Sequence, residues 1–268
     1  DGEDKLGQPM IHYASIQDWG VVDVFVLPTF RSREFAGEEG RLRSIPLTVN
    51  NRQQYQSDKE DEHIDYALRW SHYLGDWNIG LSWFQGTSRE PLFLPQATAT
   101  GIVLTPYYAL IEQSGIDAQY VSGNWLWKLE AIYRRGIGHS LADDFAASTA
   151  GFEYTLTGIN SLFWDLGLLL EYSYDSRPRL NAGPFQNDIF VGGRLSLNDI
   201  ASSEILFGYS QDADDQDSRS VFMEASTRLG DSTRVTAELY HFHSDDQQDP
   251  IYSLRRDSYI ELGLEYYY

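Results

Sequence analysis

Histidine, serine and aspartate occur together at two places in the sequence, where they could activate water or a serine hydroxyl. His139-Ser140 precedes Asp143-Asp144, and His241 and His243 precede Asp245-Asp246. Acids beside a histidine could serve as the general base of a protease, and a serine paired with a histidine could serve a phospholipase. Neighbouring strand residues point to opposite faces, which separates His139 from Ser140. Solvated loops are the commoner explanation, so we expect no catalytic residues and no enzyme activity.

Acidic runs in the same parts of the chain could supply oxygen ligands to calcium. They comprise Asp212, Asp214-Asp215 and Asp217 in one run, and Asp245-Asp246 with Asp249 in the other. Their spacing differs from that of an EF-hand loop. Zinc-ligand spacing, phosphate-binding glycine loops and nucleophile elbows do not occur in the sequence. The sequence therefore predicts no metal site and no cofactor.

Composition excludes several other functions. The 268 residues include 20 Lys+Arg and 40 Asp+Glu, a formal net charge of -20, which argues against a nucleic-acid partner because phosphates need basic surface. Cysteine is absent, so there is no disulfide framework and no thiolate chemistry. A hydrophobic content of 42% and an aromatic content of 14% predict a folded chain.

The elements that must position these residues are strands. Even the most apolar stretch, 162–174, is interrupted by Asp165 and Glu171, so no segment suits a membrane helix. Apolar and polar residues instead alternate with a period of two in segments of about ten residues, most clearly in 164–175. This pattern predicts about twelve strands, which we place at 20–34, 63–74, 77–87, 110–121, 125–134, 146–157, 164–175, 188–198, 203–212, 219–229, 234–244 and 256–268.

Connections between these segments alternate in length. Short turns carry Gly, Asn or Asp, as at Gly75-Asp76, Gly123-Asn124 and Gly230-Asp231, whereas long polar links such as 36–62 and 88–108 lie between them. Short turns on one rim and long loops on the other are typical of a transmembrane antiparallel β-barrel, with the long loops extracellular. A soluble β-sandwich or propeller is the alternative, and it would place the aromatic residues in a core.

We expect residues 1–268 to form a single outer-membrane β-barrel domain. Residues 10–17 also look like a short strand, which leaves two interpretations of residues 1–17. Either this segment is a periplasmic extension or plug and twelve strands close, or it adds a strand and the chain is a truncated larger barrel. Bacterial single-chain barrels have even strand numbers, so thirteen strands alone would not close, and of the two interpretations we favour the first.

Two parts of the sequence resemble known outer-membrane proteins. The last segment, 258–268, resembles the C-terminal signal that such barrels present to their assembly machinery. The stretch 18–35, with Gly40-Arg-Leu-Arg43 and Gly86-Thr-Ser-Arg-Glu-Pro91, resembles uncharacterised proteobacterial porin-like barrel proteins. The resemblance implies the outer membrane of a Gram-negative bacterium, with outer-membrane lipid, lipopolysaccharide and the barrel-assembly machinery as partners. It brings no catalytic residues.

The charged residues of the alternating segments carry the functional expectation, because they would line the barrel interior. Together they predict an outer-membrane channel, or porin, for passive diffusion of small solutes with a preference for cations. The alternatives are a structural or adhesive barrel without an open pore and an outer-membrane hydrolase of the phospholipase or omptin-like protease type. The predicted pore-lining residues are Asp23, Arg31, Asp65, Arg69, Lys128, Glu130, Arg134, Glu153, Asp165, Glu171, Asp175, Arg194, Glu204, Glu224, Arg228, Glu238, Glu261 and Glu265.

Overall fold

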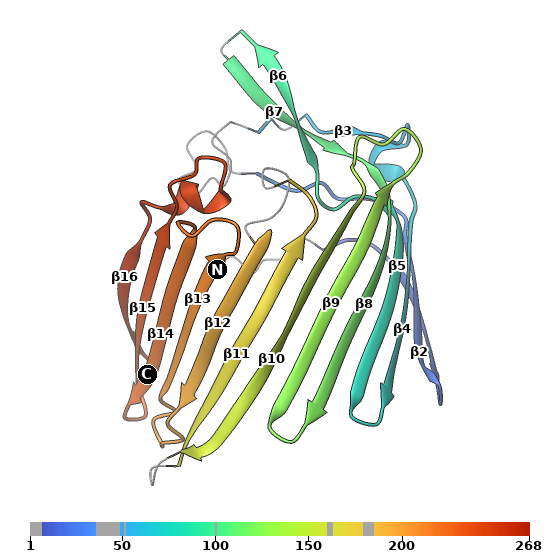
Figure 1. Ribbon diagram of the computed structural model, residues 1–268. Coiled ribbons are helices and arrows are strands. Elements are labelled where there is room, and N and C mark those ends of the chain that lie inside the picture. Colours follow the sequence, from blue (N-terminus) through green and yellow to red (C-terminus); the bar gives the residue numbers. More distant parts are fainter. Residues whose placement is uncertain (1–6, 36–48, 51, 100, 160–162, 179–184) are drawn as a thin grey trace. The chain divides into compact units, whose positions relative to one another are not determined.

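A computed structural model describes residues 7–35, 49–50, 52–99, 101–159, 163–178 and 185–268 (Figure 1). The described residues form strands and two short 3-10 helices. The strands are β1 (Ile11–Gln17), β2 (Gly20–Leu27), β3 (Gln54–Tyr55), β4 (Asp65–Leu74), β5 (Trp77–Thr87), β6 (Leu92–Thr98), β7 (Gly101–Tyr108), β8 (Leu110–Ser122), β9 (Trp125–Gly136), β10 (Phe145–Ile159), β11 (Trp164–Asp175), β12 (Asn187–Ser196), β13 (Glu204–Asp212), β14 (Arg219–Leu229), β15 (Thr233–His243) and β16 (Tyr259–Tyr266). The helices are η1 (Glu60–Glu62) and η2 (Pro250–Leu254).

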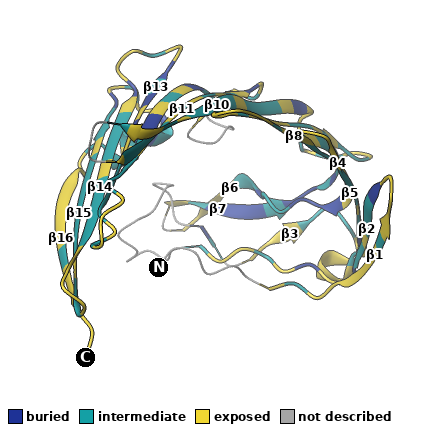
Figure 2. Ribbon diagram, turned by 90° about the horizontal axis from the view of Figure 1, so that it is seen from below, coloured by how far each residue is buried: buried dark blue, intermediate teal, exposed yellow. Residues whose placement is uncertain are grey.

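Thirteen of the strands form one antiparallel sheet. Its order is β1-β2-β4-β5-β8-β9-β10-β11-β12-β13-β14-β15-β16, so each strand pairs with its neighbours in sequence apart from the inserted β3, β6 and β7. These three form a separate small sheet in the order β3-β7-β6, and Figure 2 shows buried residues of β7 between the other two. The all-β prediction is confirmed, and each of the twelve predicted segments overlaps a strand of the large sheet.

The chain divides into two compact units. Unit 1 comprises residues Asp1–Asp117 and Ala131–Ala146, and unit 2 comprises Ala118–Glu130 and Ala147–Tyr268. Strands β8, β9 and β10 contribute residues to both units. Among the described residues, no helix has the length and apolar character needed to cross a membrane.

Three sequence predictions need correction. Residues 11–17 are not an extension beside the sheet, because β1 pairs along its whole length with β2, from Ile11 opposite Val26 to Gln17 opposite Gly20. Strand β2 ends at Leu27 rather than continuing to 34, since Pro28 has no N–H to donate to the ladder. The predicted polar link 88–108 contains the hairpin of β6 and β7.

Tight turns join the strands at one end of the hairpins, as the glycine positions predict. Gly75, Gly123 and Gly230 have φ angles of 61°, 58° and 71°, which a residue with a Cβ adopts only with strain. Each of these glycines directly follows the last residue of a strand. The short connections therefore depend on glycine, as predicted.

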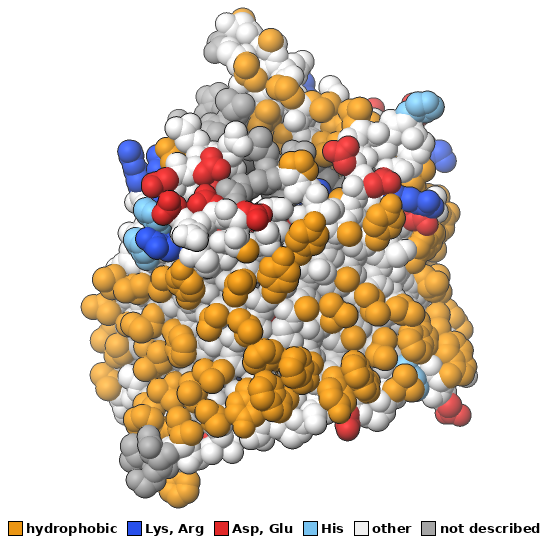
Figure 3. Space-filling model, viewed as in Figure 1, with side chains coloured by type: hydrophobic (Ala, Val, Ile, Leu, Met, Phe, Trp, Pro, Cys, Tyr) orange, Lys and Arg blue, Asp and Glu red, His pale blue; other side chains and the backbone are white. Residues whose placement is uncertain are grey.

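The two faces of the large sheet differ in chemistry. We call the face that carries Asp23 and Arg69 in unit 1, and the face that carries Glu171 in unit 2, the polar face, and the opposite face of each unit the apolar face. On β11, Leu168, Leu170, Tyr172 and Tyr174 belong to the apolar face and are exposed. Figure 3 shows hydrophobic side chains gathered over the visible face of unit 2, with most of its visible charges toward the end where the long connections leave.

Close strand packing makes a test of the sheet possible at two glycines. A Cβ at Gly151 in β10 would collide with the carbonyl oxygen of Leu170, whereas a Cβ at Gly167 in β11 would meet only the Arg194 carbonyl oxygen at 3.9 Å. We expect Gly151→Ala to destabilise the protein by about 1–3 kcal/mol, because backbone must shift to admit the methyl group. Gly167→Ala should be neutral or slightly stabilising. Denaturant unfolding followed by tryptophan fluorescence measures both, and equal stabilities for the two variants would contradict the register of β10 and β11.

Candidate functional site

The polar face of the large sheet is the candidate site, since it gathers nearly all the charged residues predicted from alternation. Within each unit, strand register and side-chain contacts place them on the polar face. Arg31 is the exception, because it lies in the connection after β2, where alternation no longer defines a face. The residues on the polar face are Asp23, Asp65, Arg69, Lys128, Glu130, Arg134, Glu153, Asp165, Glu171, Asp175, Arg194, Glu204, Glu224, Arg228, Glu238, Glu261 and Glu265.

In unit 1 the basic residues of the polar face are paired with acids. Arg69 donates two parallel hydrogen bonds to Asp117, at 2.6 and 2.9 Å, which is the strong bidentate geometry. Arg134 reaches Glu90 at 3.0 Å and Gln113 at 2.8 Å. Sequence analysis missed Asp117 and Gln113 because β8 alternates weakly, with an acid, Glu112, on its apolar face.

In unit 2 the same pairing holds for two more basic residues. The Lys128 ammonium lies 2.8 Å from Glu153 and 3.0 Å from Glu171, and Arg194 lies 2.6 Å from Glu204. These contacts prevent the basic side chains from forming a stripe of uncompensated positive charge. The partners themselves could have been predicted only from strand register, since they lie on neighbouring strands.

Several acids of the polar face, by contrast, have no basic partner within the described part of the chain. No nitrogen of a described lysine, arginine or histidine lies within 4.0 Å of the carboxylates of Glu130, Glu224, Glu238 or Glu261. The face therefore carries an excess of negative charge that its own cations do not neutralise. Such a surface raises the local concentration of positive solutes.

A buried carboxylate joins the strands of unit 1 to the long connections. Asp65 is fully buried, and its carboxylate accepts a hydrogen bond from the backbone N–H of Thr87 at 2.9 Å. His63 Nδ1 lies 2.8 Å from the same carboxylate, and the Arg89 guanidinium donates a hydrogen bond to it. The Arg89 guanidinium also lies 5.2 Å from the ring centre of Phe30. These contacts compensate the loss of hydration that a buried charge suffers.

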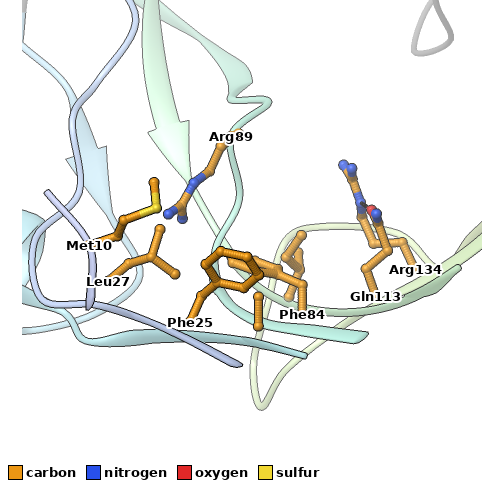
Figure 4. A pocket seen from close by; sticks show the side chains of 9 residues that line it. Met10, Phe25, Leu27, Phe84, Arg89, Gln113 and Arg134 are labelled. Carbon is orange, nitrogen blue, oxygen red and sulfur yellow. Dashed lines mark hydrogen bonds between the residues drawn. The ribbon is translucent and has the colours of Figure 1, made fainter. Parts of the chain in front are cut away.

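Beside this cluster, unit 1 contains a pocket of about 340 Å³ (Figure 4). Figure 4 shows Arg89 near Met10 and Leu27 on one side, and Gln113 with Arg134 on the other. The guanidinium groups of Arg89 and Arg134 already form salt bridges with Asp65 and Glu90. The pocket wall is therefore apolar and carries no uncompensated charge. It is lined by Met10, Phe25, Leu27, Ala67, Phe84, Arg89, Ile111, Gln113 and Arg134.

The long connections of unit 1 pack on one another. The Tyr108 hydroxyl accepts a hydrogen bond from the Arg33 backbone N–H at 2.9 Å. The centre of the Tyr108 ring lies 4.7 Å from the centre of the Phe30 ring. Burial raises the pKa of the Tyr108 phenol, and the Arg33 N–H opposes this in part. Gln56 accepts from the Leu110 N–H and donates to the Ile137 carbonyl, at 2.8 and 2.6 Å. The predicted loops are thus held to the strand ends by specific contacts.

Ser140 and His241, two of the residues considered for catalysis, have hydrogen-bond partners in the described chain. The Ser140 hydroxyl accepts from the Ala142 N–H at 3.1 Å, which is a turn contact. His241 Nδ1 lies 3.2 Å from the Ser258 hydroxyl, a pair that sequence analysis missed because His241 is on β15 whereas Ser258 directly precedes the neighbouring strand β16. The Ser258 oxygen also accepts the Phe242 N–H, and no described carboxylate contacts the His241 ring to orient it, as a serine hydrolase requires.

Aspartates of the two acidic runs accept hydrogen bonds from backbone N–H groups. Asp212 accepts from the N–H groups of Asp214 and Asp215 at 2.7 and 3.0 Å, and Asp246 accepts from the Gln248 N–H at 2.9 Å. In the ranges that the structure describes, no group of three or more His, Cys, Asp or Glu side chains could hold a metal ion. The carboxylate oxygens of Asp212 and Asp246 therefore stabilise turns of the backbone.

No protein-family model matches the chain, and a comparison with curated proteins gives no match either. The resemblance to porin-like barrel proteins thus stays a prediction. What the polar face can do follows from its own chemistry. It attracts cations and gives hydrogen-bond acceptors to polar solutes.

The buried carboxylate of unit 1 gives a sharp stability test. Asp65→Ala should destabilise the protein by about 3 kcal/mol, because it leaves the half-buried Arg89 without its charge partner. Asp76→Ala, in the exposed turn between β4 and β5, is the matched control and should change stability by less than about 0.5 kcal/mol. Denaturant unfolding compares the two variants. Equal effects would show that the Asp65 cluster does not hold the strand ends.

Proposed function

We propose that this chain forms the wall of a bacterial outer-membrane β-barrel that lets small solutes diffuse and prefers cations. The observation that carries the proposal is the opposite chemistry of the two sheet faces. Large apolar side chains are exposed on one face, and acids in excess of bases line the other. A barrel wall has lipid on one side and water on the other, and it needs this division.

The exposed apolar face fits hydrocarbon better than water. On β16, Ile260, Leu262 and Leu264 have exposed fractions of 73%, 78% and 71%. A water-soluble sandwich or propeller would cover such residues with a second layer, because large exposed apolar patches are unfavourable in water. The same exposure recurs on β9, where Trp125 and Trp127 stack at 5.6 Å. Lipid would remove all of this surface from water.

The proposal places a requirement on the sheet edges. Strands β1 and β16 end the strand order, and among the described residues each pairs on one side only. An unpaired strand edge is costly in hydrocarbon, since its N–H and C=O groups have no water to bind. In the membrane we therefore expect these two edges to be paired, with each other or through further strands.

Uncompensated acids favour an open interior over a sealed one. A barrel filled by its own side chains would pair its charges, as Arg69 and Lys128 are paired here. Carboxylates such as Glu130 and Glu238 have no such partner in the described chain and are best accommodated by water and mobile cations. This separates the channel from the structural or adhesive alternative. The hydrolase alternative lacks an orienting group beside His241.

Ion selectivity tests the proposal. In planar bilayers with a KCl gradient, the refolded protein should give reversal potentials that indicate cation preference, strongest at low salt, where screening is weakest. Neutralising Glu130, Glu224 and Glu238 together to Gln should reduce that preference. The control neutralises Asp18, Asp76 and Asp231 to Asn, which changes the net charge equally but affects exposed short turns. Anion preference of the unmodified protein, or an equal loss in the control, would refute the proposal.

A further inference from the structure

Four aromatic rings form a row across the polar face of unit 2. Phe190 on β12, Phe222 on β14, Tyr240 on β15 and Tyr259 on β16 follow one another with ring-centre distances of 6.2, 6.0 and 5.1 Å. Their planes differ by 13°, 20° and 18°, the geometry of offset stacks, which leave part of each ring uncovered. On β13 the row passes over Gly208, where a Cβ would collide with Phe222 and Phe190.

A row of carboxylates runs beside the rings on the same face. Glu224 is directly opposite Glu238, and Glu238 is directly opposite Glu261, on the three neighbouring strands β14, β15 and β16. Phe222, Tyr240 and Tyr259 are opposite one another in the same way, two residues away along each strand. Because residues two apart share a face, the aromatic and the acidic row lie next to each other.

The acidic row is unfavourable without a bound cation. Like charges directly opposite each other destabilise strand pairing. The Tyr240 hydroxyl donates to Glu224 and the Tyr259 hydroxyl interacts with Glu238, but these donors are neutral and leave the negative charge in place. The basic residues Arg228 and Arg234 lie four positions along the strands, about 13 Å away at 3.3 Å per residue. Within the described part of unit 2, then, the chain supplies no cation to this row.

We infer that the two rows bind a linear aliphatic polyammonium solute, the chemical class of the polyamines. Neighbouring strands are about 4.8 Å apart, so three carboxylates present charges at intervals that ammonium groups joined by three or four methylenes can match. The methylenes and ammonium groups would lie against the rings through apolar and cation–π contacts. The inference rests on the proposed function, because it requires the polar face to be open to solutes.

Other ligand classes fit the two rows less well. An inorganic cation would use the carboxylates but gain little from four aligned rings. A neutral sugar would stack on the rings but would not relieve the repulsion among Glu224, Glu238 and Glu261. An anion would be repelled. Only an organic polycation uses both rows.

Calorimetric titration of spermidine into the folded, detergent-solubilised full-length protein tests the inference without requiring conduction. Saturable binding is expected, and Glu238→Gln should weaken it about tenfold by removing one charge-assisted contact. Tyr240→Leu should weaken it about fivefold through loss of the central ring. Two matched controls should leave the affinity unchanged: Glu265→Gln on β16, which removes the same charge outside the row, and Tyr209→Leu on the apolar face of β13.

The outcomes separate this inference from the proposed function. Binding with the expected variant pattern supports the site even if no conductance is found, whereas conductance without spermidine binding overturns the site and leaves the channel. An equal loss of affinity in Glu265→Gln would reduce the site to general charge attraction and overturn the inference. Unchanged affinity in Tyr240→Leu would remove the aromatic contribution and overturn it too. Binding of maltotriose but not of spermidine would identify a sugar site instead.

Discussion

The alternation of side chains along thirteen paired strands is the constraint on which the rest of the structure depends. Each strand must use its backbone groups in the ladder, so its only freedom is which residues face each side, and a one-residue shift would exchange the faces. The register shift on β10 falls between Leu156 and Ile159, close to a turn, and leaves the pairing from Ala147 to Leu156 undisturbed. The faces therefore stay distinct where the sheet carries its charges and its apolar surface.

The contrast between paired and unpaired charges gives the polar face its chemistry. Arg69, Lys128, Arg134 and Arg194 are each held by a carboxylate, while Glu224, Glu238 and Glu261 are aligned against one another. A protein under selection for stability alone would separate or neutralise the three glutamates. Their alignment beside a row of rings is best explained by a positively charged solute, and the proposed channel supplies the route by which it would arrive.

Local pattern was enough to predict twelve of the thirteen strands of the large sheet, because these segments alternate and six Gly, Asn or Asp turns separate pairs of them from each other or from residues 10–17. Local pattern did not predict the hairpin of β6 and β7. Proline is disfavoured inside strands, so Pro95 and Pro106 indicate a loop in the sequence. The partners of Arg69 and Lys128, and the alignment of Phe222 with Tyr240, depend on which strands are neighbours and in what register. Those are properties of the assembled sheet, which periodicity within one segment does not contain.

Site-directed spin labelling of β11 tests the central claim that lipid covers the apolar face. The chain has no native cysteine, so single cysteines can be placed at Leu168, Leu170 and Tyr172 on the apolar face, and at Leu169, Glu171 and Ser173 on the polar face. In lipid vesicles, labels on the apolar face should collide with oxygen, which concentrates in hydrocarbon, and those on the polar face with a water-soluble nickel chelate. Nickel access at the apolar-face positions, or no alternation along the strand, would contradict the account.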